Sequence, residues 1–248
     1  MIELSHLTKK FSDLVAVNDV CLTVAKGELF VILGPNAAGK TTTIKMLTGL
    51  IKPNSGSVRV AGFDVQTQPL EVRRRLAYVP DFPFLYDKLT PWEFFRFIGQ
   101  LFEMPGAQIQ SLGTEMVRRF NLEAYMQKPI EGLSHGTRQR VAIASAFLHN
   151  PEVFVIDEPM VGLDPHHARV VKDVLRERAR GGMTAFVSTH QLSVAEEIAD
   201  RIGIMHQGRL IAAGTPQELR QHSGANRPLE DTFLLLTAQQ GSPVPGPS

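Results

Sequence analysis

Three short runs of apolar residues lie far apart along the chain, at residues 29–33 (LFVIL), 153–156 (VFVI) and 184–189 (TAFVST). Continuous apolar runs of this length predict strands that are buried on both faces, as in a parallel sheet. Each run is followed by residues suited to ligand binding or chemistry: Gly34, the pair Asp157 and Glu158, and His190. Ligands bind at the carboxyl ends of the strands in open α/β sheets. We therefore expect the three strand ends to meet at one site.

The rest of the pattern predicts two smaller units around this sheet. Residues 1–26 and 57–65 alternate or are rich in β-formers, which favours a small antiparallel sheet. Residues 90–150 have a largely helical pattern. The predicted fold class is α/β, with a mostly parallel sheet core, an antiparallel β subdomain and an inserted helical subdomain at about residues 85–150. Residues 237–248 (TAQQGSPVPGPS) have the composition of a disordered tail.

Composition restricts the classes of function that remain. The 248 residues are enough for one domain with a sizeable core, and 26 basic against 25 acidic side chains give no global field that would attract nucleic acid. The single cysteine, Cys21, cannot pair within the chain. The start of the chain lacks the apolar core of a signal peptide, and no run of 18 apolar residues occurs. We expect a cytoplasmic protein that neither crosses a membrane nor binds nucleic acid directly.

A glycine-bordered loop follows the first apolar run. Residues 34–41 (GPNAAGKT) fit the pattern G-x-x-x-x-G-K-[ST], in which backbone N–H groups and a helix N-terminus bind phosphate. Lys40 is expected to neutralise phosphate charge, and the Thr41 hydroxyl is a hard oxygen ligand suited to Mg²⁺. The alternative is a glycine-rich turn that only starts a helix. The phosphate interpretation predicts a phosphate-loop (P-loop) NTPase whose binding residues are Gly34, Pro35, Asn36, Ala37, Ala38, Gly39, Lys40, Thr41 and Thr42.

Polar residues at the other two strand ends fit the same chemistry. Asp157 is placed to hold Mg²⁺, and Glu158 is placed to accept a proton from an attacking water. Two adjacent carboxylates at a buried strand end repel each other unless they share a cation. His190 could contact the terminal phosphate or the water. The alternatives are a capping pair ahead of Pro159 and a structural histidine.

Residues 133–139 (LSHGTRQ), ahead of the strand that ends at Asp157, identify a family. They resemble the LSGGQ signature of ABC ATPases, and the resemblance covers about residues 1–220. Ser134 and Gly136 would stand at a helix N-terminus that can bind an anion. The resemblance implies that this anion is the terminal phosphate of ATP held by a second subunit. It also implies that ATP and Mg²⁺ are the cofactors and that further nucleotide contacts come from Phe11, Val17 and Asp164, with His190 as the switch histidine.

The sequence departs from the family pattern at three positions. Ala37 stands where glycine is frequent, and alanine there would cost on the order of 1 kcal/mol if the position needs a positive φ. His135 replaces the first of the paired signature glycines, and we expect its side chain to point away from phosphate. Asp81 replaces the usual glutamine; it can still face Mg²⁺ or a water, but a carboxylate cannot donate a hydrogen bond.

The region after Asp81 carries eight of the chain's 18 aromatic residues. In ABC transporters the membrane subunit docks here, although aromatics at helical spacing usually belong to the core. Residues 229–237 (LEDTFLLLT) resemble the terminal helix of single-domain exporter subunits. These features predict an ABC ATPase domain over residues 1–220, and a terminal helix with a disordered tail over residues 221–248.

The predicted function is Mg²⁺-dependent ATP hydrolysis that drives export. Such a subunit pairs with a separate membrane permease and a second ATPase subunit, and it sits peripherally on the inner face of the cell membrane. We expect a homodimer, although the sequence leaves a different second subunit open. One alternative is a soluble ABC ATPase of translation or DNA maintenance, although the chain has neither a second nucleotide domain nor a long coiled coil. The other alternative is a nucleotide-binding regulator with little turnover.

Overall fold

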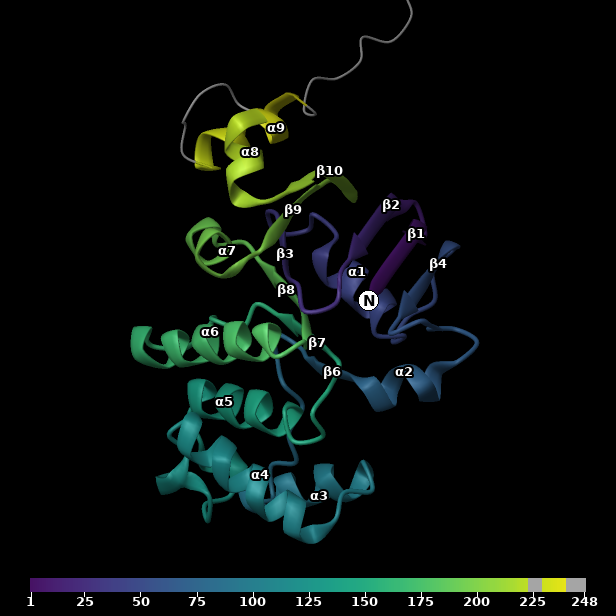
Figure 1. Ribbon diagram of the computed structural model, residues 1–248. Helices are drawn as coiled ribbons and strands as arrows, with labels where there is room; N and C mark the ends of the chain where they lie inside the picture. Colours follow the sequence, from purple (N-terminus) through teal and green to yellow (C-terminus); the bar gives the residue numbers. More distant parts are fainter. Residues whose placement is uncertain (223–228, 240–248) are drawn as a thin grey trace, which may run out of the picture.

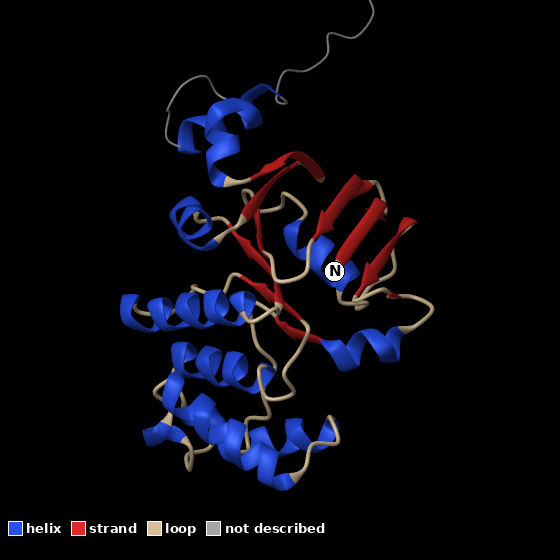
Figure 2. Cartoon of the chain, viewed as in Figure 1, coloured by secondary structure: helices blue, strands red, loops and turns tan. Residues whose placement is uncertain are grey.

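The computed structural model of the chain describes residues 1–222 and 229–239. The described residues form two sheets, nine α-helices and two short 3₁₀ helices (Glu123–Tyr125 and Ile130–Gly132); Figure 2 distinguishes helices from strands by colour. The strands are β1 (Ile2–Phe11), β2 (Leu14–Val24), β3 (Leu29–Leu33), β4 (Ser55–Val60), β5 (Phe63–Asp64), β6 (Leu76–Val79), β7 (Val153–Asp157), β8 (Thr184–Thr189), β9 (Arg201–His206) and β10 (Arg209–Gly214). The helices are α1 (Lys40–Leu47), α2 (Pro69–Arg75), α3 (Pro91–Leu101), α4 (Gly106–Arg119), α5 (His135–Ala146), α6 (Pro165–Arg180), α7 (Leu192–Ile198), α8 (Pro216–His222) and α9 (Leu229–Gln239).

The larger sheet has the strand order β10-β9-β3-β8-β7-β6. The five strands from β9 to β6 pair in parallel, and β10 is an antiparallel edge strand. The three predicted apolar strands are therefore neighbours, in the order β3-β8-β7, and every residue of these strands is buried. Register pairs Leu33 with Thr189 and Asp157 with Ser188, so the carboxyl ends of the three strands meet at one edge. The predicted convergence is confirmed.

Alternation along β3 separates two hydrophobic cores. Val31 and its neighbours two residues away face the core formed with α5, α6 and α7. Phe30 and Ile32 face the second core, which includes Ile44 of α1 and residues of the antiparallel sheet. That smaller sheet has the order β2-β1-β4-β5 and is antiparallel throughout, as predicted. Helix α1 thus lies between the two sheets (Figure 1).

The helices predicted for residues 90–150 are α3, α4 and α5, gathered at one end of the molecule (Figure 1). Helix α3 begins with a capping box between Thr90 and Glu93, which satisfies backbone donors at its first turn. Helices α3 and α4 approach closely at Gly99, where a Cβ would lie 2.5 Å from Ile109 Cγ1. Only a residue without a side chain permits this spacing.

Helices α8 and α9 lie at the opposite end of the molecule (Figure 1), where α9 corresponds to the predicted terminal helix. The predicted tail begins too early, because residues 237–239 belong to α9. Thr237 Oγ1 donates a hydrogen bond to Phe233 O at 2.8 Å, as a residue inside a helix can. The rest of the predicted tail, residues 240–248, lies outside the described residues. Among the described helices, none has both the length and the apolar character needed to cross a membrane.

Candidate functional site

The loop between β3 and α1 has a backbone that is wound tightly against the rest of the chain. Ala37 has φ 63° and Gly39 has φ 105°, so both adopt the left-handed conformation. Ala38 N–H donates to Pro35 O at 3.2 Å, and Gly208 N–H donates to Ala38 O at 2.9 Å. The loop leads directly into the N-terminus of α1, whose free N–H groups and dipole favour an anion. Ala37 therefore has the positive φ at which alanine is expected to be strained.

Lys40, the first residue of α1, has a buried side chain. Its Nζ donates to Gly34 O at 2.7 Å and to Pro35 O at 3.1 Å, and it lies 3.9 Å from Glu158 Oε1. Burial lowers the pKa of Lys40, and the carboxylates of Glu158 and Asp157 oppose that shift. The ammonium group is thus held between the loop carbonyls and the end of β7.

Oxygen ligands gather beside Lys40. Thr41 Oγ1 donates to Asp157 Oδ2 at 2.8 Å, and the Ser188 hydroxyl donates to the other oxygen of Asp157, which is only 2% exposed. Burial and the charge of Asp157 raise the pKa of the Asp81 carboxyl, although His135 and His190 partly offset the shift. A hydroxyl and two carboxylates that repel one another form an all-oxygen set that fits Mg²⁺.

Glu158 and His190 form a pair at the same edge of the sheet. Glu158 Oε1 lies 2.9 Å from His190 Nδ1, and the Glu158 side chain is 13% exposed. Glu158 N–H donates to Ser188 O at 3.1 Å, and its backbone has φ 47°. This left-handed conformation of a non-glycine residue directs a carboxylate away from the strand. Such backbone geometry is frequent at functional sites.

An open cavity of about 670 Å³ joins these groups. The predicted residues that line it are Phe11, Asn36, Ala37, Ala38, Gly39, Lys40, Thr41, Thr42, Asp81, Asp157 and Glu158. Phe11 is half-exposed and lies under Lys9 Nζ, 5.1 Å from the ring centroid. His190 is not among the lining residues, but its ring contacts Glu158. Gly34 and Pro35 contribute carbonyl oxygens to Lys40 rather than cavity surface.

Val17 does not reach this cavity. Its side chain is fully buried in the core of the antiparallel sheet, because the β2 pleat turns it inward. Leu14, Val15 and Ala16 line the cavity instead. The lining also includes the turn between β9 and β10, at Gln207 and Gly208, which sequence patterns did not point to. A short polar turn gives no signal of its own in one sequence.

Ser134, Gly136 and Asp164 form a separate group, and none of them lines the cavity. Ser134 is the N-cap of α5 and accepts from Thr137 N–H at 3.4 Å. A Cβ on Gly136 would lie 2.7 Å from Gly162 O, so the start of α5 packs directly against the segment that precedes α6. Asp164 caps α6, and hydrogen bonding to His167 lowers its pKa to about 2. The predicted site residues are therefore in two places.

The His135 side chain lies at this contact between α5 and the segment that precedes α6. A Cβ on Gly162 would lie 2.4 Å from His135 Cδ2, so the ring rests on the glycine. Its centroid lies 6.2 Å from that of Phe82. His135 thus packs between the start of α6 and the loop that follows Asp81.

The strand, loop and helix around Lys40, together with the buried Asp157, define the class of phosphate-loop nucleotide-binding proteins. Within that class, residues 17–161 match the family model described as ABC transporter, and the chain belongs to the ABC transporter family. The chain is 34% identical over 224 residues to the ABC transporter ATP-binding protein NatA of Bacillus subtilis, covering 88% of this chain and 91% of NatA. It is 35% identical over 240 residues to the probable multidrug ABC transporter ATP-binding protein YbhF of Escherichia coli. That match covers 95% of this chain but 41% of YbhF, so the chain spans about two fifths of that relative.

Solved structures give the same assignment. One, of the ATP-binding subunit of an ABC transporter, has a TM-score of 0.91 and 32% identity, and the match covers 96% of this chain and 99% of the other. Another is a dimeric post-hydrolysis state of the ATP-binding cassette MJ0796, bound to ADP and Pi. It has a TM-score of 0.79 and 26% identity, over 87% of this chain and 98% of that chain.

Proposed function

We propose that this chain binds Mg·ATP and hydrolyses it in a head-to-tail dimer, and that the cycle drives export through a separate membrane permease. One observation carries the proposal. The phosphate loop, the buried Asp157 and Glu158 line one cavity, and His190 contacts Glu158, whereas Ser134 and Gly136 lie outside the lining. The chain contains both halves of a nucleotide site, but in two places.

The residues at the cavity divide the chemistry of hydrolysis among them. The loop N–H groups and Lys40 bind and orient the phosphates. Thr41, Asp157 and Asp81 would hold the magnesium ion, which when bound neutralises phosphate charge. Glu158 would accept the proton of the attacking water, and His190, 2.9 Å away, would orient Glu158.

The second half of the site would come from another copy of the chain. Ser134 and the backbone N–H of Gly136 stand at the N-terminus of α5, where the helix dipole favours the terminal phosphate. Two chains related by a two-fold axis would each supply this helix to the partner's loop. ATP between them would stabilise the closed dimer, and cleavage would release it. The dimeric MJ0796 cassette supports this arrangement.

The partner in the membrane would dock near the loop that follows Asp81. The aromatic residues of this region divide by burial: Phe94 and Phe95 belong to the core, whereas Phe82, Phe84 and Tyr86 are 74%, 94% and 58% exposed.

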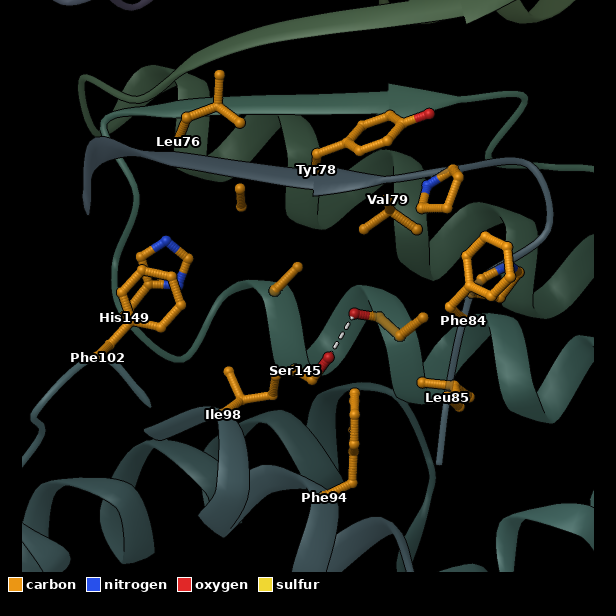
Figure 3. A pocket seen from close by; sticks show the side chains of 15 residues that line it. Leu76, Tyr78, Val79, Phe84, Leu85, Phe94, Ile98, Phe102, Ser145 and His149 are labelled. Carbon is orange, nitrogen blue, oxygen red and sulfur yellow. Dashed lines mark hydrogen bonds between the residues drawn. The ribbon is translucent and has the colours of Figure 1, made fainter. Parts of the chain in front are cut away.

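Beside these exposed rings lies a cavity of about 230 Å³ between β6 and helices α3 and α5 (Figure 3). Exposed apolar groups next to a cavity are typical of protein-binding surfaces. We infer a permease at this surface, which would hold the chain on the inner face of the membrane. Export rather than uptake is supported by a relative that is named for export, the Nod factor export ATP-binding protein I of Ralstonia nicotianae.

The two alternatives are less well supported. A soluble role in translation or DNA maintenance leaves the exposed aromatic loop without a partner. A regulator without turnover would not need Lys40 held 3.9 Å from Glu158, nor His190 beside that carboxylate.

Glu158→Gln tests the proposal, because an amide keeps the shape of the side chain but cannot accept the proton at neutral pH. We expect ATP turnover to fall by about 10²–10⁴-fold. Dimerisation of the purified chain with saturating Mg·ATP, followed by light scattering, should be kept or enhanced.

Glu3→Gln is the matched control, since Glu3 is exposed on β1, and it should leave both readings unchanged. Turnover in Glu158→Gln at the wild-type rate would exclude Glu158 as the base. A strictly monomeric Glu158→Gln protein at saturating Mg·ATP would contradict the dimer.

A further inference from the structure

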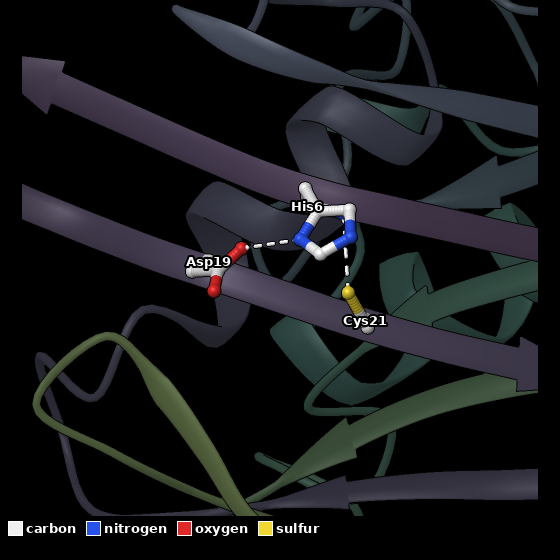
Figure 4. A group of neighbouring side chains, drawn as sticks. All are labelled: His6, Asp19 and Cys21. Atoms are coloured by element: carbon white, nitrogen blue, oxygen red, sulfur yellow. Dashed lines mark hydrogen bonds and ion pairs between the residues drawn. The ribbon is translucent and has the colours of Figure 1, made fainter.

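A second group of metal-ligating side chains lies on the antiparallel sheet, away from the nucleotide cavity. It consists of His6 on β1 and of Asp19 and Cys21 on β2 (Figure 4). One ligand atom from each residue lies within 4.8 Å of the other two, and all three residues are exposed. Across residues 1–222 and 229–239, no other set of three His, Cys, Asp or Glu side chains comes this close.

The contacts within the group already join the three residues. His6 Nδ1 lies 2.8 Å from Asp19 Oδ1, and the His6 backbone N–H donates to Cys21 Sγ at 3.2 Å. Figure 4 shows the imidazole between the carboxylate and the sulfur. Asp19 and Cys21 are two residues apart on one strand, so their side chains share a face of the sheet.

An irregularity in strand pairing brings His6 to that face. The β1–β2 register shifts between Leu4 and Leu7, and the backbones of His6 and Asp19 have φ 49° and 56°. Asp19 N–H donates to Thr8 Oγ1 at 3.1 Å, which ties the two strands together beside the shift.

Strand β4 supports the same irregularity from the other side of β1. A Cβ on Gly56 would lie 2.4 Å from His6 O, so a glycine is needed for β4 to pass here. The backbones of β1, β2 and β4 therefore bring His6, Asp19 and Cys21 together. Their proximity does not depend on side-chain rotamers alone.

The three ligand types select a borderline-soft ion. A thiolate, an imidazole and a carboxylate form the mixed sulfur, nitrogen and oxygen set that suits Zn²⁺ rather than Mg²⁺, which prefers oxygen alone. Ligand atoms of a tetrahedral zinc site lie about 3–4 Å apart. Exposed side chains can close the remaining gap without moving the strands.

We propose that His6, Asp19 and Cys21 bind one Zn²⁺ ion, with water in the fourth position. On binding, the Cys21 thiol loses its proton to solvent, so the thiolate and the Asp19 carboxylate balance the two charges of the ion. The site would link β1 to β2. It shares no residue with the nucleotide cavity and does not depend on the function proposed above.

Cobalt provides a specific test, because a thiolate bound to Co²⁺ gives a charge-transfer absorption band and Cys21 is the only cysteine. The full chain, reduced and free of nucleotide, is titrated with CoCl₂ and then with ZnCl₂. We expect the band to saturate at one equivalent of Co²⁺ and to disappear when Zn²⁺ displaces the cobalt. Cys21→Ser should abolish the band.

Three variants separate a three-ligand site from a thiol that binds metal alone. His6→Gln and Asp19→Asn should each weaken Co²⁺ binding by about tenfold or more, whereas the exposed carboxylate variant Glu3→Gln should bind as the wild type does. Zinc should also slow alkylation of Cys21 by iodoacetamide about tenfold in the wild type and in Glu3→Gln, but not in Asp19→Asn. Absence of the band, or an undiminished band in both His6→Gln and Asp19→Asn, would overturn the proposal.

Discussion

Replacing Ala37 by glycine tests how the phosphate loop is held. Alanine at φ 63° is in the left-handed region, which costs an L-residue roughly 1–2 kcal/mol. Glycine removes this strain but adds freedom to the unfolded chain, which costs about 0.4–1 kcal/mol. The difference predicts that Ala37→Gly raises the free energy of unfolding by about 0.8 kcal/mol. The midpoint of thermal unfolding should then rise by about 2–3 °C.

The adjacent Ala38 provides a matched control. Ala38 is 3% exposed and its φ is not positive, so Ala38→Gly relieves no strain. It loses a buried methyl group, worth about 0.8 kcal/mol, and carries the same unfolded-state cost of about 0.4–1 kcal/mol. Urea unfolding, followed by circular dichroism, should therefore show opposite signs for two alanine-to-glycine changes at neighbouring positions. Equal destabilisation in both variants would refute the strain argument at Ala37.

The affinity of Ala37→Gly for ATP is a second measurement that tests the same argument. The hydrogen bonds that shape the loop, from Ala38 N–H to Pro35 O and from Gly208 N–H to Ala38 O, lie within the chain. They hold φ at Ala37 without help from phosphate, so the strain is the same before and after binding. We expect the affinity for ATP, measured by calorimetry, to change by less than about twofold. A gain of about tenfold, equivalent to 1.4 kcal/mol, would mean that the loop takes up this φ only on binding.

Two further predictions concern Asp81, in the loop after β6, and His149, after α5. Asp81→Gln keeps an oxygen that can face the magnesium ion, so it should change the basal ATP turnover less than the ratio of permease-stimulated to basal turnover, which should change by about fivefold or more. An equal loss in both rates would contradict a coupling role. Burial lowers the pKa of His149 from 6.5 to about 4, so between these values the unfolded chain binds a proton that the folded chain does not. Stability should fall as pH falls through this window, by at most about 1.4 kcal/mol per pH unit. His149→Phe, which keeps the stacking on Phe102, should reduce that slope in urea unfolding at pH 4.5 and pH 7.

Local sequence patterns were sufficient to predict the parts of the candidate site that lie at the ends of buried strands. The apolar runs that end at Leu33, Asp157 and Thr189 were recognisable because both faces of these strands are buried, and parallel pairing then brings their ends together. Val17 was assigned to the nucleotide site on resemblance, and the pleat of β2 turns it into the core. The contribution of Gln207 depends on how the β9–β10 turn folds over the loop, which is a long-range contact that no local pattern carries.

The three departures from the family pattern also show what a linear comparison leaves out. Ala37 could be judged from backbone geometry alone, because its cost depends on one φ angle. Asp81 and His135 are far apart in the sequence, yet the His135 imidazole is near enough to lower the pKa of the Asp81 carboxyl. The effect of either residue therefore depends on the other, and their proximity is a property of the fold that the sequence alone does not show.

The loop from Asp81 to Asp87 connects the two halves of the proposed nucleotide site within one chain. At its start, Asp81 lines the cavity with Asp157. At its end, Asp87 Oδ1 lies 2.8 Å from Arg138 Nη2 on α5, close to the helix N-terminus that would receive the partner's phosphate.

Between these two ends, Phe82 packs near His135 and remains 74% exposed. A permease that moves this exposed loop would act on both groups of residues at once, because the His135 contact and the Asp87–Arg138 ion pair would pass a displacement of Phe82 to α5. Asp81 and His135 thus lie where permease movement and ATP chemistry would be coupled. For this reason we expect Asp81→Gln to alter the stimulation by the permease more than the basal ATP turnover.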